Sequence, residues 1–183
     1  MNIEPSSQQP HIPEPTGDDQ KEVFAFIGFA MFIAQGLEAE LISLVVALRA
    51  NGDVALDEAD VERLFTDHER RTMGQLVAAV RSLLAVSADE ETAIALAVDD
   101  RNRLAHRFFR EHAEEFFTAA GRRAMIDDLR AICTSLLSAD SAVSWLSDQL
   151  WAIAGVSKAV RQNGGSGLEG QGRAARSGRI TNR

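Results

Sequence analysis

Apolar residues recur along most of this chain at the three- and four-residue spacing of an α-helix. The first long run predicts a helix from about residue 19 to residue 50. One face of it carries Ala30, Ile33, Leu37, Leu41, Leu44 and Leu48. Its first half is apolar on every side, so we expect this half at the centre of the fold or against a second subunit. The helix should end at 51–53, where Gly52 suits a left-handed cap.

Helical patterns continue beyond this first helix. A short helix is predicted over about 57–67, with Val61, Leu64 and Phe65 facing inward. Strand patterns are scarce, so the predicted fold class is all-α. We expect an antiparallel helical bundle.

Two capping boxes mark the starts of further helices. In each, a Ser or Thr is followed three residues later by Glu or Gln, which lets the two side chains bond to the first free N–H groups. Thr72 and Ser87 occupy these positions. The second box begins a helical segment that we expect to continue to 116–117, and a last helix or pair of helices should cover about 122–156.

Composition divides the chain into three parts. Residues 1–18 are rich in Pro and polar residues, which predicts a flexible N-terminal segment. We expect residues 19–158 to form the helical bundle domain. Residues 159–183 are rich in Gly and Arg, which predicts a disordered basic tail. The net charge is −8, but Lys158 and the residues after it carry six cations and one acid. An acidic body argues against broad coating by nucleic acid, although a local basic site stays open. The tail is either a solvated terminus, which we prefer, or a nucleic-acid contact.

Cysteine and hydropathy patterns bear on the compartment. The single Cys133 lies in an apolar run, so we expect a core thiol and no internal disulfide or cysteine-based metal cage. One lone thiol without a signal peptide predicts a cytoplasmic protein. The longest apolar run, 23–34, is shorter than the roughly 20 residues that span a bilayer, and acidic residues follow it, so we expect no membrane association.

The segment 99–109 is the one place where an arginine, an amide and a histidine crowd into an apolar helical pattern. On an ideal helix over 98–117, at ~100° per residue, Arg101 falls near the centre of the apolar arc. Arg103, Arg107 and Arg110 fall on the opposite side and are expected to be solvated. A buried guanidinium needs a partner, because an unpaired buried charge is costly.

A partner for Arg101 can be proposed from the first helix. Glu38 projects onto an apolar flank of that helix, where its carboxylate and the Arg101 guanidinium would neutralise each other. Arg101 and His106 lie five positions apart, roughly 140° around a straight helix. One straight helix therefore does not aim both at a single point, so either the helix is irregular here or both flanks line a groove, such as a twofold dimer interface would supply.

Arg101-Asn102-x-x-x-His106, followed by the aromatic Phe108 in a helical protein of this size, resembles the HEPN superfamily. The resemblance covers the motif and, loosely, the helical body from about 20 to 155. It implies a helical bundle that dimerises through its motif helices, and in many members a metal-independent endoribonuclease of toxin–antitoxin, phage-defence or RNA-processing systems. A branch of the family has Tyr two residues after the His. Here that position is Phe108, so modification of such a Tyr by a partner nucleotidyltransferase is excluded.

The resemblance also implies roles for single residues. Arg101 would stabilise the phosphate in the transition state, His106 would act as general base or acid on the ribose 2′-hydroxyl or the leaving group, and Asn102 would orient one of them. The chemistry suits these side chains, because His titrates near neutrality and Arg stays charged with a planar fork of donors. RNA, a second copy of the chain and an antitoxin or other protein are the partners it implies.

Other readings of the chain compete with this one. Arg101 and His106 could be a structural ion-pair residue and a hydrogen-bonded boundary histidine in a non-catalytic dimeric interaction module that holds a protein partner. A metal bundle would need Glu-x-x-His motifs, which are missing, so His112 is expected to be a hydrogen-bonded core histidine. No phosphate-cradling glycine loop is evident, and we expect no cofactor and no metal. Trp145 and Trp151 are expected in core or interface packing.

Overall fold

The computed structural model describes residues 10–52, 58–68, 70–84 and 87–154. Within them the chain is helical and has no strand, which confirms the all-α prediction. The elements are α1 (Gln20–Gly52), α2 (Glu58–His68), α3 (Met73–Leu83), α4 (Ala88–His106), α5 (Phe108–Glu111), the 3-10 turn η1 (Glu115–Phe117) and α6 (Ala119–Ala154). The basic tail and the first nine residues lie outside the described part.

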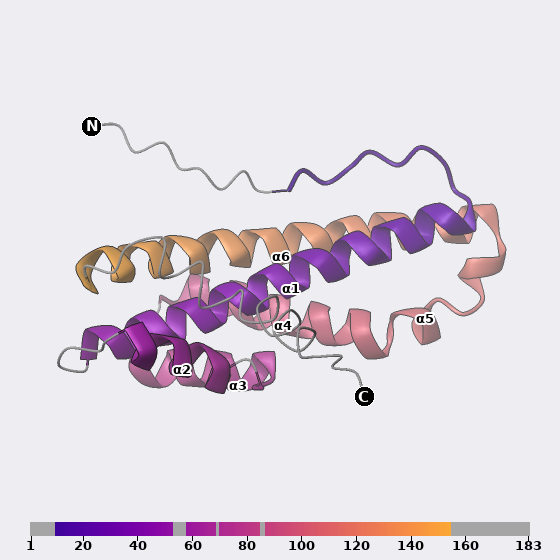
Figure 1. The fold of residues 1–183 in the computed structure, drawn as a ribbon. Coiled ribbons are helices and arrows are strands. Elements are labelled where there is room, and N and C mark those ends of the chain that lie inside the picture. Colours follow the sequence, from indigo (N-terminus) through magenta and orange to yellow (C-terminus); the bar gives the residue numbers. More distant parts are fainter. Residues whose placement is uncertain (1–9, 53–57, 69, 85–86, 155–183) are drawn as a thin grey trace, which may run out of the picture.

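Three long helices form the body, and they alternate in direction along the chain (Figure 1). α1 and α6 run the same way, since the Arg122 side chain bonds to the Asp18 carbonyl at one end and Asn51 Nδ2 donates to the Leu150 carbonyl, 2.9 Å away, at the other. α4 lies beside this pair and runs in the opposite direction (Figure 1). Successive long helices are therefore antiparallel. The first and third are parallel, because a single long helix lies between them in sequence.

The two short helices cover the C-terminal end of α1. Val61 and Phe65 of α2 are buried in a small cluster with Trp151 of α6. The Trp151 ring stacks on Phe65 at 6.4 Å between centroids, and its Nε1 donates to Ser43 Oγ at 3.0 Å. Trp145 is 61% exposed, so one of the two tryptophans is core and the other is surface.

Both predicted capping boxes are confirmed. The Thr72 side chain accepts from the Gln75 N–H, and the Gln75 side chain accepts from the Thr72 N–H. Ser87 and Glu90 do the same at the start of α4. Each box satisfies N–H groups that the first helical turn leaves without a partner.

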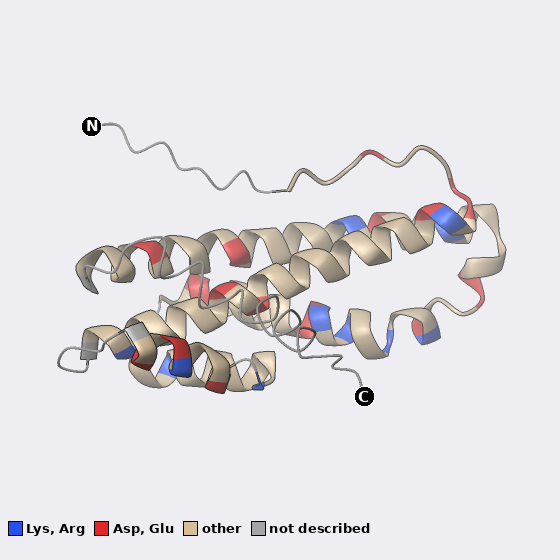
Figure 2. Ribbon diagram, in the orientation of Figure 1, with Lys and Arg blue, Asp and Glu red and all other residues tan. Residues whose placement is uncertain are grey.

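α1 has a buried face and an exposed apolar face. The predicted row is buried except for the partly buried Leu48 at its end, but Phe24 and Phe32 are 53% and 63% exposed, so burial of the first half on every side is wrong within one protomer. Gly28 and Gly36 lie on the same exposed face with open space above them. Figure 2 shows the middle of α1 almost free of charged residues. This face is therefore available to a second chain.

By length and composition alone, α1 would also pass as a membrane span. Its residues 20–51 include an 18-residue window of mean hydropathy 1.7, of which 44% is buried inside the fold. A core helix of a soluble protein passes the same test. Much of the apolar surface of α1 packs against α6 and α3 in the main core.

The sequence pattern predicted one continuous helical segment after Ser87, but the structure divides this segment. α4 ends at His106, Arg107 takes a non-helical conformation (φ −126°, ψ −27°), and the short α5 and η1 turn the chain into α6. The turn buries Phe108 in the core. α6 then begins at Ala119, three residues before the predicted start, and continues unbroken to Ala154.

At Gly121 the start of α6 lies very close to the backbone of η1. A Cβ atom there would overlap the backbone of Glu115. We expect Gly121→Ala to lower the free energy of unfolding by about 1–3 kcal/mol, because the backbone of η1 must shift to make room. Urea unfolding followed by circular dichroism measures this. Gly74→Ala in α3 is the matched control: its Cβ meets nothing within 4 Å, so it should leave stability unchanged or raise it by up to about 1 kcal/mol. Equal effects of the two substitutions would contradict the steric argument.

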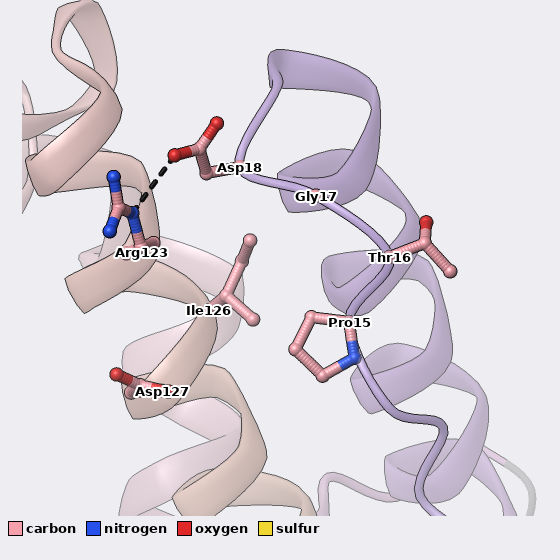
Figure 3. Close-up of a pocket in the computed structure, with 7 residues that line it drawn as sticks. All are labelled: Pro15, Thr16, Gly17, Asp18, Arg123, Ile126 and Asp127. Carbon is pink, nitrogen blue, oxygen red and sulfur yellow. Dashed lines mark hydrogen bonds and ion pairs between the residues drawn. The ribbon is translucent and has the colours of Figure 1, made fainter.

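The described half of the N-terminal segment, residues 10–18, lies along α6 (Figure 1). Glu14 and Asp18 form ion pairs with Arg130 and Arg123 at 2.8 and 2.9 Å. Figure 3 shows the open pocket of about 450 Å³ left between this segment and α6. It is lined by Pro15, Thr16, Gly17, Asp18, Arg123, Ile126 and Asp127, so none of the predicted site residues lines it.

Candidate functional site

The motif residues lie in the last two turns of α4, where α4 passes α1. The Arg101 side chain is 27% exposed, and its Nη2 lies 3.8 Å from Oε1 of Glu38, which is 26% exposed. Its Nη1 donates to Asn102 Oδ1 at 3.3 Å. The predicted ion pair with Glu38 is therefore present. It holds the guanidinium half-buried between two helices, with one edge accessible to solvent.

His106 differs from Arg101 in having no partner. The residue is exposed, and no described side chain or carbonyl forms a hydrogen bond or ion pair with its ring. Asn102 is also exposed. An exposed imidazole without a fixed partner can exchange protons with a bound ligand.

Arg101 and His106 do not converge within one protomer. α4 is regular through His106, so five positions place their side chains roughly 140° apart around the helix axis. A ligand that touches both needs a second wall. Next to the motif, Phe24 of α1 and Phe109 of α5 are half-exposed with ring centroids 5.8 Å apart. This aromatic pair provides an apolar surface beside the motif on which a second copy of the chain could pack.

Arg103 is the arginine that the projection placed wrongly. It was expected on the solvated side, but its Nη1 and Nη2 donate to the two carboxylate oxygens of Asp128 on α6 at 2.9 and 2.6 Å. Its Nε donates to Glu111 at 2.6 Å. His112 Nε2 donates to the same Asp128 at 2.8 Å, in agreement with the expected hydrogen-bonded histidine. The projection failed because it assumed one unbroken helix with a single buried side, whereas α4 contacts both α1 and α6.

This Arg103–Asp128 cluster fixes the end of the motif helix. It joins the last turn of α4 to α5 and to α6 across the break at Arg107. Hydrogen bonds from Arg103, and then from His112, hold the pKa of Asp128 below its ordinary value. The bond to Asp128 raises the pKa of Arg103 in turn. No sequence signal singled out Asp128, because its role depends on a residue 25 positions away that meets it only in the folded chain.

The lowered pKa of Asp128 predicts how the unfolding free energy of the protein changes with pH in the acidic range. Its ordinary pKa is 3.8 and its folded pKa is lower, so its contribution is complete above about pH 4–5 and is lost as the pH falls through the folded value. We expect Asp128→Asn to reduce the unfolding free energy at pH 7 by about 1.5–3 kcal/mol, the range for hydrogen bonds to charged groups. The difference from wild type should shrink at pH 3. Urea unfolding at both pH values measures it.

The control for that prediction is the neighbouring residue. Asp127→Asn removes one charge from the exposed side of α6 without touching the Arg103–Asp128 cluster. It should change stability by less than about 0.5 kcal/mol. A loss in the Asp128 variant that stays the same between pH 7 and pH 3 would rule out the carboxylate as its cause.

Other reactive groups in the described part do not form a second centre. Among the described residues no three His, Cys, Asp or Glu side chains are grouped as a metal ion would require. Burial raises the pKa of the Cys133 thiol to about 11, so it stays protonated in the core. The candidate site thus consists of Arg101, Asn102 and His106, supported by Glu38.

Comparison with protein-family models, with curated proteins and with solved structures finds no match for this chain.

Proposed function

We propose that this protein is a metal-independent endoribonuclease, or an RNA-binding protein, that acts through Arg101, Asn102 and His106 at a homodimer interface. We place it in the cytoplasm, in a toxin–antitoxin or defence system with a protein antitoxin as partner. The proposal combines the resemblance of the motif with the chemistry of its three side chains. The observation that carries it is the contrast between Arg101, held in place by Glu38, and His106, exposed and without a partner.

The cleavage step follows from these groups. The ribose 2′-oxygen attacks the neighbouring phosphorus and the bond to the 5′-oxygen of the next nucleotide breaks. The products are a 2′,3′-cyclic phosphate and a 5′-hydroxyl. His106 either takes the proton of the 2′-hydroxyl or gives one to the departing 5′-oxygen. Arg101 stabilises the charge that builds on the non-bridging phosphate oxygens, and Asn102 orients its guanidinium.

A dimer supports this chemistry better than a single protomer does. One α4 helix points Arg101 and His106 to different flanks, so a groove between two α4 helices brings an arginine of one chain toward a histidine of the other. The exposed apolar face of α1 and the Phe24–Phe109 pair supply surface for such an association. Arginine-to-phosphate contacts at a local site also suit a chain whose overall charge is −8, because they need no broad basic surface.

The direct test is an RNA cleavage assay with the wild-type protein. We expect total RNA to be cut in the presence of EDTA, with 2′,3′-cyclic phosphate and 5′-hydroxyl ends on the fragments. Light scattering on the same sample should give the mass of a dimer. If the protein does not cut RNA in EDTA but cuts it once divalent cations are added, the metal-independent mechanism is rejected. If the protein binds RNA and never cuts it, the RNA-binding function remains and the nuclease function is rejected.

The alternative function is a non-catalytic dimeric interaction module. Two observations favour it: Glu38 already neutralises Arg101, and an apolar face of α1 is exposed. In that case Arg101 is structural and the face with Phe24 and Phe32 holds a protein partner. The two functions differ in the effect of Arg101→Ala. The module loses stability or its dimeric state, whereas the nuclease keeps both and loses cleavage.

A further inference from the structure

A second pocket lies at the C-terminal end of α1, where α3 packs against it. It is open to solvent and has a volume of about 570 Å³. Its lining is Arg49, Arg71, Gln75, Ala78, Ala79 and Ser82. Two guanidinium groups therefore line one hollow, and no carboxylate of the described residues lines it with them.

The arginines of the described part divide into those that pair with a carboxylate and those, such as Arg70 and Arg110, that do not. Arg101, Arg103, Arg107, Arg123 and Arg130 all form ion pairs with carboxylates. Within the described residues neither Arg49 nor Arg71 forms an ion pair. The chain has a net charge of −8, yet every lining residue in the described part is a cation or is uncharged. Two like charges that share a small hollow repel each other unless an anion lies between them.

His68, at the end of α2, is a buried histidine near both arginines of the pocket. The residue is 2% exposed, and its Nδ1 donates to the Leu64 carbonyl at 2.7 Å. Burial lowers the pKa of His68, and Arg71 and Arg49 lower it further. Both guanidinium groups thus lie close enough to one imidazole to disfavour its charge. His68 stays neutral at pH 7, so the positive charge of the pocket comes from the two arginines.

We propose that this pocket binds a terminal phosphate group. A phosphate dianion matches two guanidinium groups in charge, and each guanidinium offers a planar pair of donors to its oxygens. Gln75, which also lines the pocket, adds a further donor: its Oε1 accepts from the Thr72 N–H, and its amide Nε2 forms no hydrogen bond with a described residue. A carboxylate ligand would neutralise only one of the two arginines.

The pocket is separate from the motif on α4. Arg49 follows Glu38 by 11 residues on α1, which is about 16 Å along the helix at ~1.5 Å per residue. The proposal therefore does not rest on RNA cleavage.

Isothermal titration calorimetry tests the pocket with inorganic phosphate and pyrophosphate, in EDTA and at an ionic strength kept constant with sodium chloride. We expect one site per chain in the wild type. Arg49→Ala and Arg71→Ala should each weaken binding at least tenfold. Arg70→Ala should bind as the wild type does, because Arg70 is exposed and does not line the pocket.

Two further comparisons separate the sources of the phosphate. AMP is compared with adenosine, and a 5′-phosphorylated RNA oligonucleotide with its 5′-hydroxyl form. Tighter binding of AMP identifies a free nucleotide, and tighter binding of the phosphorylated oligonucleotide identifies an RNA end. Circular dichroism confirms folding, and Arg49→Gln and Arg71→Gln replace any alanine variant that fails to fold. Wild-type affinity in the Arg49 and Arg71 variants, equal weakening in Arg70→Ala, or absence of binding to every phosphate overturns the proposal.

Discussion

His106→Ala is expected to lower the rate of RNA cleavage by a factor of about 10² to 10⁴, the usual contribution of a positioned general acid or base. Arg101→Ala should lower it by about 10² to 10³, the effect of removing one donor that stabilises charge in a transition state. His106 is exposed and has no partner among the described residues, so its substitution should leave the fold unchanged. The measurement is the initial rate on a labelled RNA in EDTA.

The matched control is Arg110→Ala. Arg110 is an exposed arginine just after the motif, and no carboxylate among the described residues pairs with it. It should cleave at close to the wild-type rate, which separates the motif from a general loss of positive charge. Circular dichroism and light scattering confirm that each variant is folded and dimeric. A folded, dimeric His106→Ala that cleaves like the wild type would remove His106 from the mechanism.

Glu38→Gln adds information about Arg101. It keeps the shape of the side chain but removes the charge that lies 3.8 Å from the guanidinium. If Glu38 only positions Arg101, cleavage should fall less in this variant than in Arg101→Ala. The same loss in both variants would mean that the ion pair acts as one unit.

Trp151→Ala is expected to have the largest effect on stability, a loss of about 3–5 kcal/mol in the free energy of unfolding. The Trp151 side chain projects from α6 and is fully buried against α1 and α2, where it stacks on Phe65 and donates to Ser43. Its removal leaves a cavity and takes one hydrogen bond from the Ser43 hydroxyl, which keeps its bond to the Ser147 hydroxyl at 2.9 Å. Urea unfolding followed by circular dichroism measures the change.

Trp145→Ala is the control, because it removes the same side chain six positions earlier on α6. Trp145 is 61% exposed, so its loss should change the unfolding free energy by less than about 1 kcal/mol. Similar losses at the two positions would mean that Trp145 is covered in solution, as it would be in an interface. A small loss at Trp151 would contradict the packing of α2 against the end of α6.

The parts of the fold that local sequence determines could be predicted. The two capping boxes needed only residues three positions apart, and the buried row of α1 needed only its own spacing. The pair of Glu38 and Arg101 could also be proposed, because each was a charged residue on an apolar flank. A charge in such a place requires a partner wherever the chain folds.

The parts that depend on contacts between distant segments could not be predicted. The break at Arg107 is stabilised by Asp128 and by the burial of Phe108, and neither contact has a local pattern. The solvated position expected for Arg103 was wrong for the same reason. The pocket at Arg49 and Arg71 likewise forms only when α3 packs on the end of α1.

The parallel packing of α1 and α6 has a consequence for synthesis of the chain. α1 is complete at Gly52, but its main partner is complete only at Ala154, about 100 residues later. At about 5–20 residues per second, the ribosome needs roughly 5–20 s to make that stretch. During this interval the most apolar segment of the protein has emerged without the helix that covers it. The nascent chain should therefore depend on chaperones or on early docking of α3 and α4 to avoid aggregation.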